Sequence, residues 1–155
     1  MNRASRLILA LGLICVATAA GAVEIQAKNP WVRSAAEGQA TTPAYVDILS
    51  DTALKLVAAT SPWATKIELR TIDTGAGRSG ERTVAAFEVP AGTALRLAPG
   101  GSYLALIEVT RAFGNGDFVP LTLLFEDAAK TPHTLAVKAQ ARGLLLPQRA
   151  APKSD

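Results

Sequence analysis

Short segments in which apolar and polar residues alternate run through most of this 155-residue sequence, and each is closed by glycine, proline or polar turn residues. In residues 66–71, Ile67 and Leu69 alternate with charged residues, so one face of an extended strand would be buried and the other solvated. Further segments of this kind lie at residues 44–48, 82–89, 103–109, 118–125 and 134–139. Several short strands separated by turns are typical of an all-β sandwich, and no sustained helical period follows residue 22.

The first 22 residues have the pattern of a secretory signal peptide. Arg3 and Arg6 precede an apolar run from Leu7 to Ala20, and small residues at 20–22 predict cleavage before Val23. The run is shorter than the roughly 18 residues that a membrane-spanning helix needs. We therefore expect a periplasmic or secreted protein with a signal peptide at 1–22, a single β-sandwich domain at 23–143 and a C-terminal tail at 144–155.

The same segment contains the cysteine that a lipid anchor would use. Cys15 follows Gly12-Leu13-Ile14, which puts a large residue where a lipid-attachment site has a small one, so we expect Cys15 to be lost with the signal peptide. Cleavage also removes two arginines and leaves 14 basic against 13 acidic residues, a formal charge of +1 instead of +3. This balance gives no reason to invoke nucleic acid.

The remaining residues carry few groups for metal binding or catalysis. Met1 and Cys15 are the only methionine and cysteine, and His133 is the only histidine. A lone histidine at the start of a strand is more often a packed residue than a ligand, because a metal site needs three or four donors. Asp117, Glu126 and Asp127 lie in predicted turns without the regular oxygen spacing of a calcium loop. Nucleophilic catalysis lacks an activated cysteine or a histidine motif, so we expect no enzyme activity.

Several short sequence motifs lie at characteristic distances from one another along the chain. Trp31-Val32-Arg33, Pro43-Ala44-Tyr45, Ser61-Pro62 and Pro99-Gly100-Gly101 stand ahead of or within the alternating segments. Over residues 29–139 this arrangement resembles the periplasmic copper chaperones of the PCu(A)C family. The resemblance implies a cupredoxin-like Greek-key β-sandwich, a role in copper handling and in maturation of the CuA site of cytochrome c oxidase, and oxidase-assembly factors as partners.

The family binds Cu(I) with the pattern His-x10-Met-x21-His-x-Met. Laid on this sequence without gaps, the four positions fall on Arg70, Glu81, Tyr103 and Ala105. Cu(I) selects thioether, thiolate and imidazole groups, whereas arginine offers no lone pair, alanine has no donor atom, and carboxylate and phenol are hard ligands. The resemblance therefore predicts the frame of the copper site without its ligands, and we expect no bound metal.

Two interpretations of Arg70, Glu81 and Tyr103 remain open at this level. In the first, the guanidinium pairs with the carboxylate and the hydroxyl joins them, which forms a polar recognition patch. In the second, these are separately solvated strand-end charges. Two functions follow: a PCu(A)C-like protein that still acts in copper handling, through an unconventional ligand set or a metal-free docking surface, or a copper-independent protein-binding or scaffold module. Neither function involves nucleic acid or a membrane span in the mature chain.

Overall fold

The computed structural model describes residues 21–75, 77 and 80–143, and every regular element within them is a β-strand. The strands are β1 (Ile25–Arg33), β2 (Thr41–Ser50), β3 (Leu54–Thr60), β4 (Ala64–Asp73), β5 (Gly80–Thr83), β6 (Phe87–Val89), β7 (Leu95–Leu97), β8 (Ser102–Val109), β9 (Phe118–Glu126) and β10 (Pro132–Arg142). The all-β fold class is confirmed. Across the described ranges no helix is long and apolar enough to cross a membrane. Residues 1–20 of the expected signal peptide and the expected tail at 144–155 lie outside the described residues.

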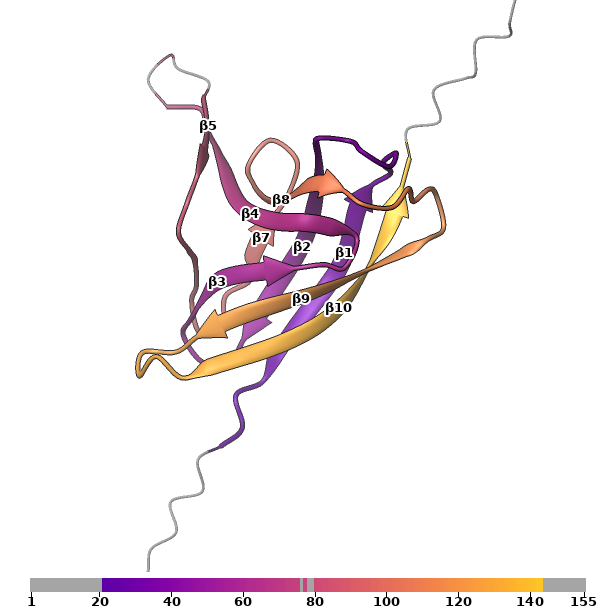
Figure 1. Ribbon diagram of the computed structural model, residues 1–155. Coiled ribbons are helices and arrows are strands. Elements are labelled where there is room, and N and C mark those ends of the chain that lie inside the picture. The colour runs from indigo at the N-terminus through magenta and orange to yellow at the C-terminus, as the bar shows by residue number, and fades with distance from the viewer. Residues whose placement is uncertain (1–20, 76, 78–79, 144–155) are drawn as a thin grey trace, which may run out of the picture.

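The strands form one continuous sheet. Its order is β5-β4-β8-β2-β1-β10-β9-β3-β6, with β7 beside β2. The first and last strands, β1 and β10, run parallel to each other, and the other paired strands are antiparallel. The sheet curls over, so that β3 and β9 lie in front of β1 and β2 in Figure 1.

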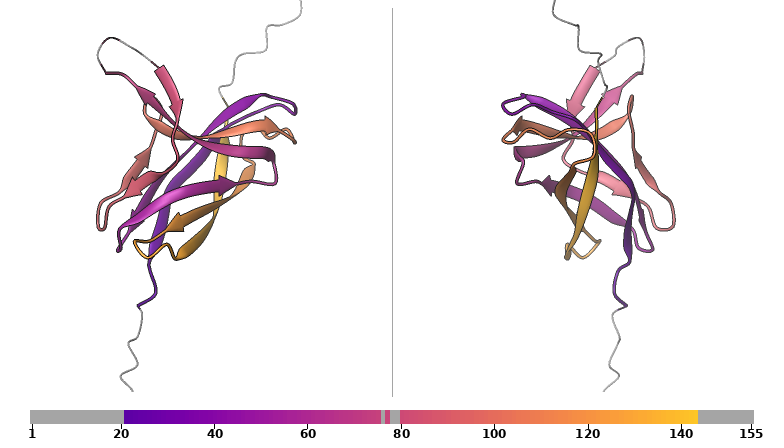
Figure 2. Two further views of the ribbon diagram at one scale, coloured as in Figure 1. Left: turned by 60° about the vertical axis from the view of Figure 1, so that its left-hand side comes forward. Right: turned by 90° about the vertical axis from the view of Figure 1, so that its right-hand side faces the viewer.

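The core lies between the two halves of this curled sheet. Leu104 and Leu106 of β8 and Leu123 and Phe125 of β9 are fully buried in the same apolar cluster. Because side chains from both halves meet there, the fold is a β-sandwich built from one sheet, as Figure 2 shows. Burying each such side chain stabilises the fold by roughly 1.5–3 kcal/mol relative to leaving it exposed.

Alternation in β2 and β8 decides which side chains enter this core. Ala44, Val46 and Ile48 point inward and are almost completely buried, as the sequence pattern predicts. Tyr103 and Ala105 take the opposite face of β8 from Leu104 and Leu106, which also agrees with the pattern. Both are nevertheless buried, because the outer face of the sheet carries a second, smaller apolar cluster.

The segment at 82–89, expected as one strand, forms parts of two. Its beginning lies in β5, which pairs with β4, whereas its end is β6, which pairs with β3. The backbone N–H of Val84 donates to the carbonyl of Leu69 at 2.8 Å, after which the chain leaves the first half of the sandwich. The three residues between β5 and β6 thus connect the two opposite edges of the sheet. One continuous strand could not pair with both β4 and β3, because these strands lie in different halves of the sandwich.

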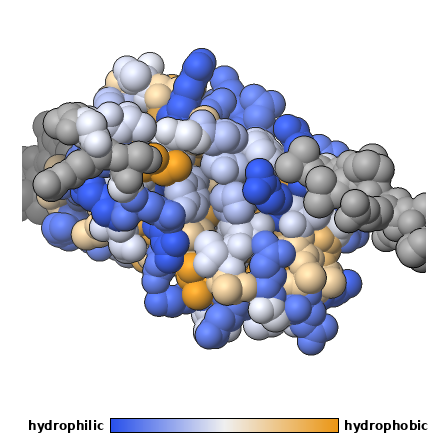
Figure 3. Space-filling view, turned by 90° about the horizontal axis from the view of Figure 1, so that it is seen from above, coloured by the Kyte–Doolittle hydropathy of each residue, from blue (hydrophilic) through white to orange (hydrophobic). Residues whose placement is uncertain are grey.

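The hairpin of β4 and β5 projects from the body of the sandwich (Figures 1 and 2). All four residues of β5 are exposed, and β5 is an edge of the sheet. The face seen from above in Figure 3 is mainly hydrophilic, and its hydrophobic spots are small and separated. Polar side chains on this side are therefore open to solvent and to partners.

Candidate functional site

Three neighbouring strands bring the predicted site positions together on the outer face of the sheet. Arg70 of β4 lies directly opposite Tyr103 of β8, and Glu68 lies opposite Ala105. On the other side of β4, Glu81 of β5 lies opposite Ile72. Since direct cross-strand partners point to the same face, these positions form one surface although they are far apart in sequence.

The guanidinium of Arg70 lies between two carboxylates. Its Nη1 donates to Oε1 of Glu81 at 2.8 Å, and its Nη2 and Nε donate to Oε2 of Glu68 at 2.7 and 3.0 Å. The hydroxyl of Tyr103 donates to the same oxygen of Glu81. Lys66 adds a second cation, with its Nζ 2.6 Å from Oε1 of Glu68. These five residues are termed the Arg70 cluster below.

Hydrogen bonding within the Arg70 cluster keeps Glu68, Arg70 and Glu81 charged and Tyr103 neutral. The Tyr103 hydroxyl and then the Arg70 guanidinium lower the pKa of Glu81 below its usual range. Lys66 and Arg70 lower the pKa of Glu68 in the same way, and the two carboxylates raise the pKa of Arg70. Burial, followed by the bond to Glu81, raises the pKa of Tyr103, which therefore stays a neutral donor at physiological pH.

Tyr103 is held in place by a row of aromatic rings on the outer face. The rings of Tyr45 and Tyr103 have centroids 6.2 Å apart, and those of Trp31 and Tyr45 are 4.5 Å apart. Tyr45, Tyr103 and Ala105 are buried here, and Trp31, Ile72 and Ile107 pack against them. Burial also raises the pKa of Tyr45. The row crosses β1, β2 and β8 and fixes the Tyr103 hydroxyl against Glu81.

The Arg70 cluster remains partly accessible to solvent. The side chain of Arg70 is 25% exposed and that of Glu81 is 44% exposed. An open hollow of about 290 Å³ adjoins them and is also lined by Arg82 and Thr83. Each exposed ion pair contributes only about 0–1 kcal/mol to stability, so the arrangement is better suited to presenting oriented polar groups than to holding the fold together.

The donor atoms of this site do not fit Cu(I). Arg70 presents only N–H donors and Ala105 presents none, while the oxygens of Glu81 and Tyr103 are hard and already hydrogen-bonded to each other. In the described parts of the chain, no three or more His, Cys, Asp or Glu side chains are grouped so as to hold a metal ion. Of the four positions, Arg70 and Glu81 therefore form an ion pair, Tyr103 is hydrogen-bonded to it, and Ala105 is buried in the outer apolar cluster.

His133, the lone histidine, lies elsewhere, at the start of β10. Its Nε2 is 3.2 Å from Oδ2 of Asp127 in the turn between β9 and β10. Asp127 Oδ1 also accepts the backbone N–H groups of Ala129 and Thr131 at 2.8 and 2.9 Å. The bond from Thr131, then that from His133, lowers the pKa of Asp127. Both side chains are thus engaged in closing this turn.

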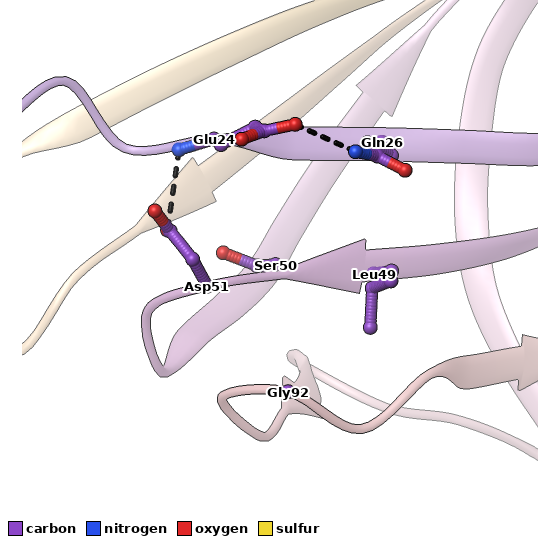
Figure 4. Close-up of a pocket in the computed structure, with 6 residues that line it drawn as sticks. All are labelled: Glu24, Gln26, Leu49, Ser50, Asp51 and Gly92. Atoms are coloured by element: carbon purple, nitrogen blue, oxygen red, sulfur yellow. Dashed lines mark hydrogen bonds between the residues drawn. The ribbon is translucent and has the colours of Figure 1, made fainter.

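A second hollow, of about 190 Å³, lies where β1 begins and β2 ends. It is lined by Glu24, Gln26, Leu49, Ser50, Asp51 and Gly92 (Figure 4). Gln26 Nε2 donates to Oε1 of Glu24 at 2.6 Å, and the backbone N–H of Glu24 donates to Oδ1 of Asp51 at 3.2 Å. The carboxylates of this hollow are already bonded within its wall.

Two parts of the site were not anticipated from the sequence. Glu68 bonds Arg70 more extensively than Glu81 does, and its position two residues away on the same strand face was the available signal. The tilted contact between the rings of Trp31 and Tyr45 depends on the register between β1 and β2, which no local pattern reveals.

The fold places the protein in the class of PCuAC-type β-sandwich domains. The copper-bound PCuAC domain from PmoF2 superposes with a TM-score of 0.62 at 21% identity, covering 77% of this chain and 92% of that one, and this likeness concerns the fold alone. The Cu(I) form of DR1885 from Deinococcus radiodurans gives a TM-score of 0.58 at 28% identity and covers 78% of each chain. The predicted resemblance to PCu(A)C proteins is confirmed at the level of the fold.

Within this class, the chain belongs to the LpqE-like family. The family described as "Putative lipoprotein LpqE-like" matches residues 25–137. The "Putative lipoprotein Lxx21020" of Leifsonia xyli subsp. xyli is 32% identical over 118 residues, which are 74% of this chain and 69% of that protein. Cys15, which we expect to be lost with the signal peptide, lies outside the described residues.

Proposed function

We propose that this protein is an extracytoplasmic recognition module of the PCuAC fold that acts in copper handling without carrying Cu(I) itself. The observation that carries the proposal is the ion pair between Arg70 and Glu81, two positions of the family's ligand frame, which Glu68 reinforces from outside the frame. A cation that belongs to the chain pairs with the carboxylates there, and the oxygen atoms of the cluster are hard ligands, so a soft metal ion would find no suitable donor.

The context for this role comes from relatives. DR1885 is named in its Cu(I) form, and the family and its Leifsonia xyli member are described as lipoproteins, which supports a location outside the cytoplasm. We assign the protein to the periplasm or cell envelope, at a step in maturation of the CuA site of cytochrome c oxidase. Its partner there would be an oxidase-assembly factor that recognises Arg70, Glu81 and Tyr103.

Recognition would use charge-assisted hydrogen bonds. Glu81 is the most exposed member of the Arg70–Glu81–Tyr103 set, and both of its described bonds are made by a single oxygen, Oε1. Its other oxygen can accept a donor from a partner without breaking the cluster. Such contacts contribute orientation and specificity more than affinity.

A Cu(I) competition titration tests the metal-free part of the proposal. A chain beginning at Val23 retains all the described strands and lacks Met1 and Cys15, the only thioether and thiol of the sequence. Under reducing conditions it should leave Cu(I) on a colorimetric chelator. The variant Arg70→His/Glu81→Met/Tyr103→His/Ala105→Met should remove Cu(I) from the chelator, because it restores the family's ligand pattern.

The controls separate ligand chemistry from disruption of the cluster. The variant Arg70→Gln/Glu81→Gln/Tyr103→Phe removes the charges without adding soft ligands and should bind no Cu(I). Because Ala105 is fully buried, a methionine there could disturb the fold, so Arg70→His/Glu81→Met/Tyr103→His, which leaves Ala105 unchanged, is tested beside the quadruple variant. Tight one-to-one binding by the unmodified protein would overturn the proposal.

A second candidate function is a copper-independent scaffold on the same sandwich. The hard, internally bonded donor set of the Arg70 cluster favours it, because nothing in that set requires a metal partner. The genomic neighbourhood distinguishes the two candidates. Oxidase-assembly genes or a His- and Met-bearing paralogue beside this gene would support copper handling, and an unrelated neighbourhood would support the scaffold.

A further inference from the structure

The outer face of β1, β10 and β9 carries a set of cations arranged in register around two aromatic residues. Arg33 of β1 lies directly opposite Arg142 of β10. In the next outward row, Trp31 lies opposite Gln140, which in turn lies opposite Phe118 of β9. One row further, Lys138 lies opposite Pro120. The face formed by Arg33, Lys138, Arg142, Trp31 and Phe118 is termed the β1–β10 face.

The cations of the β1–β10 face have no carboxylate partners in the part of the chain that the structure describes. Lys55, Lys66, Arg70, Arg82 and Lys130 each form an ion pair, whereas Arg33, Lys138 and Arg142 form none. No carboxylate occupies the outward positions of the three rows. Two arginines directly opposite each other on neighbouring strands repel, and a bound anion would relieve that repulsion.

The same face presents apolar groups to solvent. Phe118 is 57% exposed and is the one large hydrophobic side chain that is exposed among the described residues. Trp31 is partly exposed, and the guanidinium carbon of Arg142 lies 5.4 Å from the centroid of its ring. Aromatic rings flanked by long basic side chains match the boundary between lipid headgroups and acyl chains, where rings enter the boundary and cations reach phosphate.

We propose that the β1–β10 face docks on an anionic membrane surface. Arg33, Lys138 and Arg142 contact headgroup phosphates, while Phe118 and Trp31 enter the boundary region. An acidic protein would also satisfy the cations, but an exposed phenylalanine beside a tryptophan, with cations in the rows on either side, fits a lipid boundary better. The proposal goes beyond the recognition function of the Arg70 cluster and does not depend on copper.

Vesicle co-sedimentation of the full-length protein tests the charge requirement. Vesicles of phosphatidylcholine with about one-third phosphatidylglycerol are compared with pure phosphatidylcholine vesicles, and the comparison is made between variants because Arg3, Arg6 and the apolar segment Leu7–Ala20 are the same in all of them. Each cation near an anionic surface is worth roughly five-fold in partitioning, so Arg33→Gln/Lys138→Gln/Arg142→Gln should weaken binding to the anionic vesicles about 100-fold. The matched control Lys55→Gln/Arg82→Gln/Lys130→Gln removes the same charge elsewhere and should bind nearly as the unmodified protein does.

Tryptophan quenching tests which face meets the lipid. The sequence has two tryptophans, so Trp63→Phe leaves Trp31 as the sole fluorophore. Lipids brominated on the acyl chains should quench Trp31 in anionic vesicles, and Phe118→Ser should weaken both quenching and binding. Equal partitioning to anionic and neutral vesicles would overturn the proposal. Charge-dependent binding without quenching of Trp31 would overturn it too, because another part of the protein would then be meeting the lipid.

Discussion

Replacing Tyr103 with phenylalanine isolates the hydrogen bond that couples the aromatic row to the Arg70 cluster. The ring, whose centroid lies 6.2 Å from that of Tyr45, is retained, and only the hydroxyl that donates to Glu81 is lost. A hydrogen bond to a charged group is worth roughly 1.5–3 kcal/mol when buried. Because the Glu81 side chain is 44% exposed, water replaces part of it, and we expect a loss of about 1 kcal/mol, or about 4 °C in Tm.

The pH dependence of this loss gives the sharper test. The folded-state pKa of Glu81 lies below its usual value near 4.5, and the Tyr103 hydroxyl is the first cause. A lowered carboxylate pKa contributes stability that is fully present above the unfolded pKa and is lost as pH falls through the folded pKa. The stability gap between the unmodified protein and Tyr103→Phe should therefore be largest near neutral pH and shrink below about pH 4.

Urea unfolding across pH, together with an NMR titration of the Glu81 carboxyl carbon, measures both effects. The pKa of Glu81 should rise in Tyr103→Phe, since its main stabilising donor is gone. Tyr45→Phe is the matched control, because it removes a hydroxyl for which the structure describes no hydrogen bond while preserving the same row of rings. The reasoning is refuted if the pKa of Glu81 is the same with and without the Tyr103 hydroxyl, or if the stability gap does not vary with pH.

Three further perturbations test the fold. Leu104→Ala, at a fully buried core position, should cost about 2–5 kcal/mol in urea unfolding, while Ile107→Ala on the half-buried outer face should cost clearly less. Gly100→Ala should lower the free energy of unfolding by about 1 kcal/mol because Gly100 has φ +82°, whereas the neighbouring Gly101→Ala, at a position without positive φ and with ordinary contacts, should be nearly neutral. Asp127→Asn should reduce, without abolishing, the loss of stability that the unmodified protein shows as pH falls below about 4, since Asp127 shares its lowered pKa with Glu68 and Glu81.

The parts of the fold that could be predicted from the sequence are those governed by local periodicity. In β2 and β8, inward Ala44, Val46, Leu104 and Leu106 alternate with outward residues, and the period of two fixes the buried face. The division of residues 82–89 between β5 and β6 could not be read in this way. Local periodicity is compatible with a single strand across both parts. Only their different partner strands, β4 for β5 and β3 for β6, distinguish them.

The candidate site shows the same division. The spacing of the family's ligand pattern predicted that Arg70, Glu81 and Tyr103 lie together. In the structure Glu81 is hydrogen-bonded to both Arg70 and Tyr103. The second carboxylate, Glu68, could not be predicted from this spacing, because it is not one of the four positions of the family frame. The contact between the rings of Trp31 and Tyr45 could not be predicted without the tertiary structure, because β1 changes register between Lys28 and Trp31.

The parallel pairing of β1 with β10 ties the beginning of the domain to its end. The centre of the sheet cannot close until the last strand is available, so almost the whole chain must be present before stable folding begins. In a chain synthesised from its N-terminus, β10 is the last strand to appear, and its pairing with β1 and β9 joins the two halves of the sheet. Arrival of the C-terminal strand is therefore the step that completes the domain.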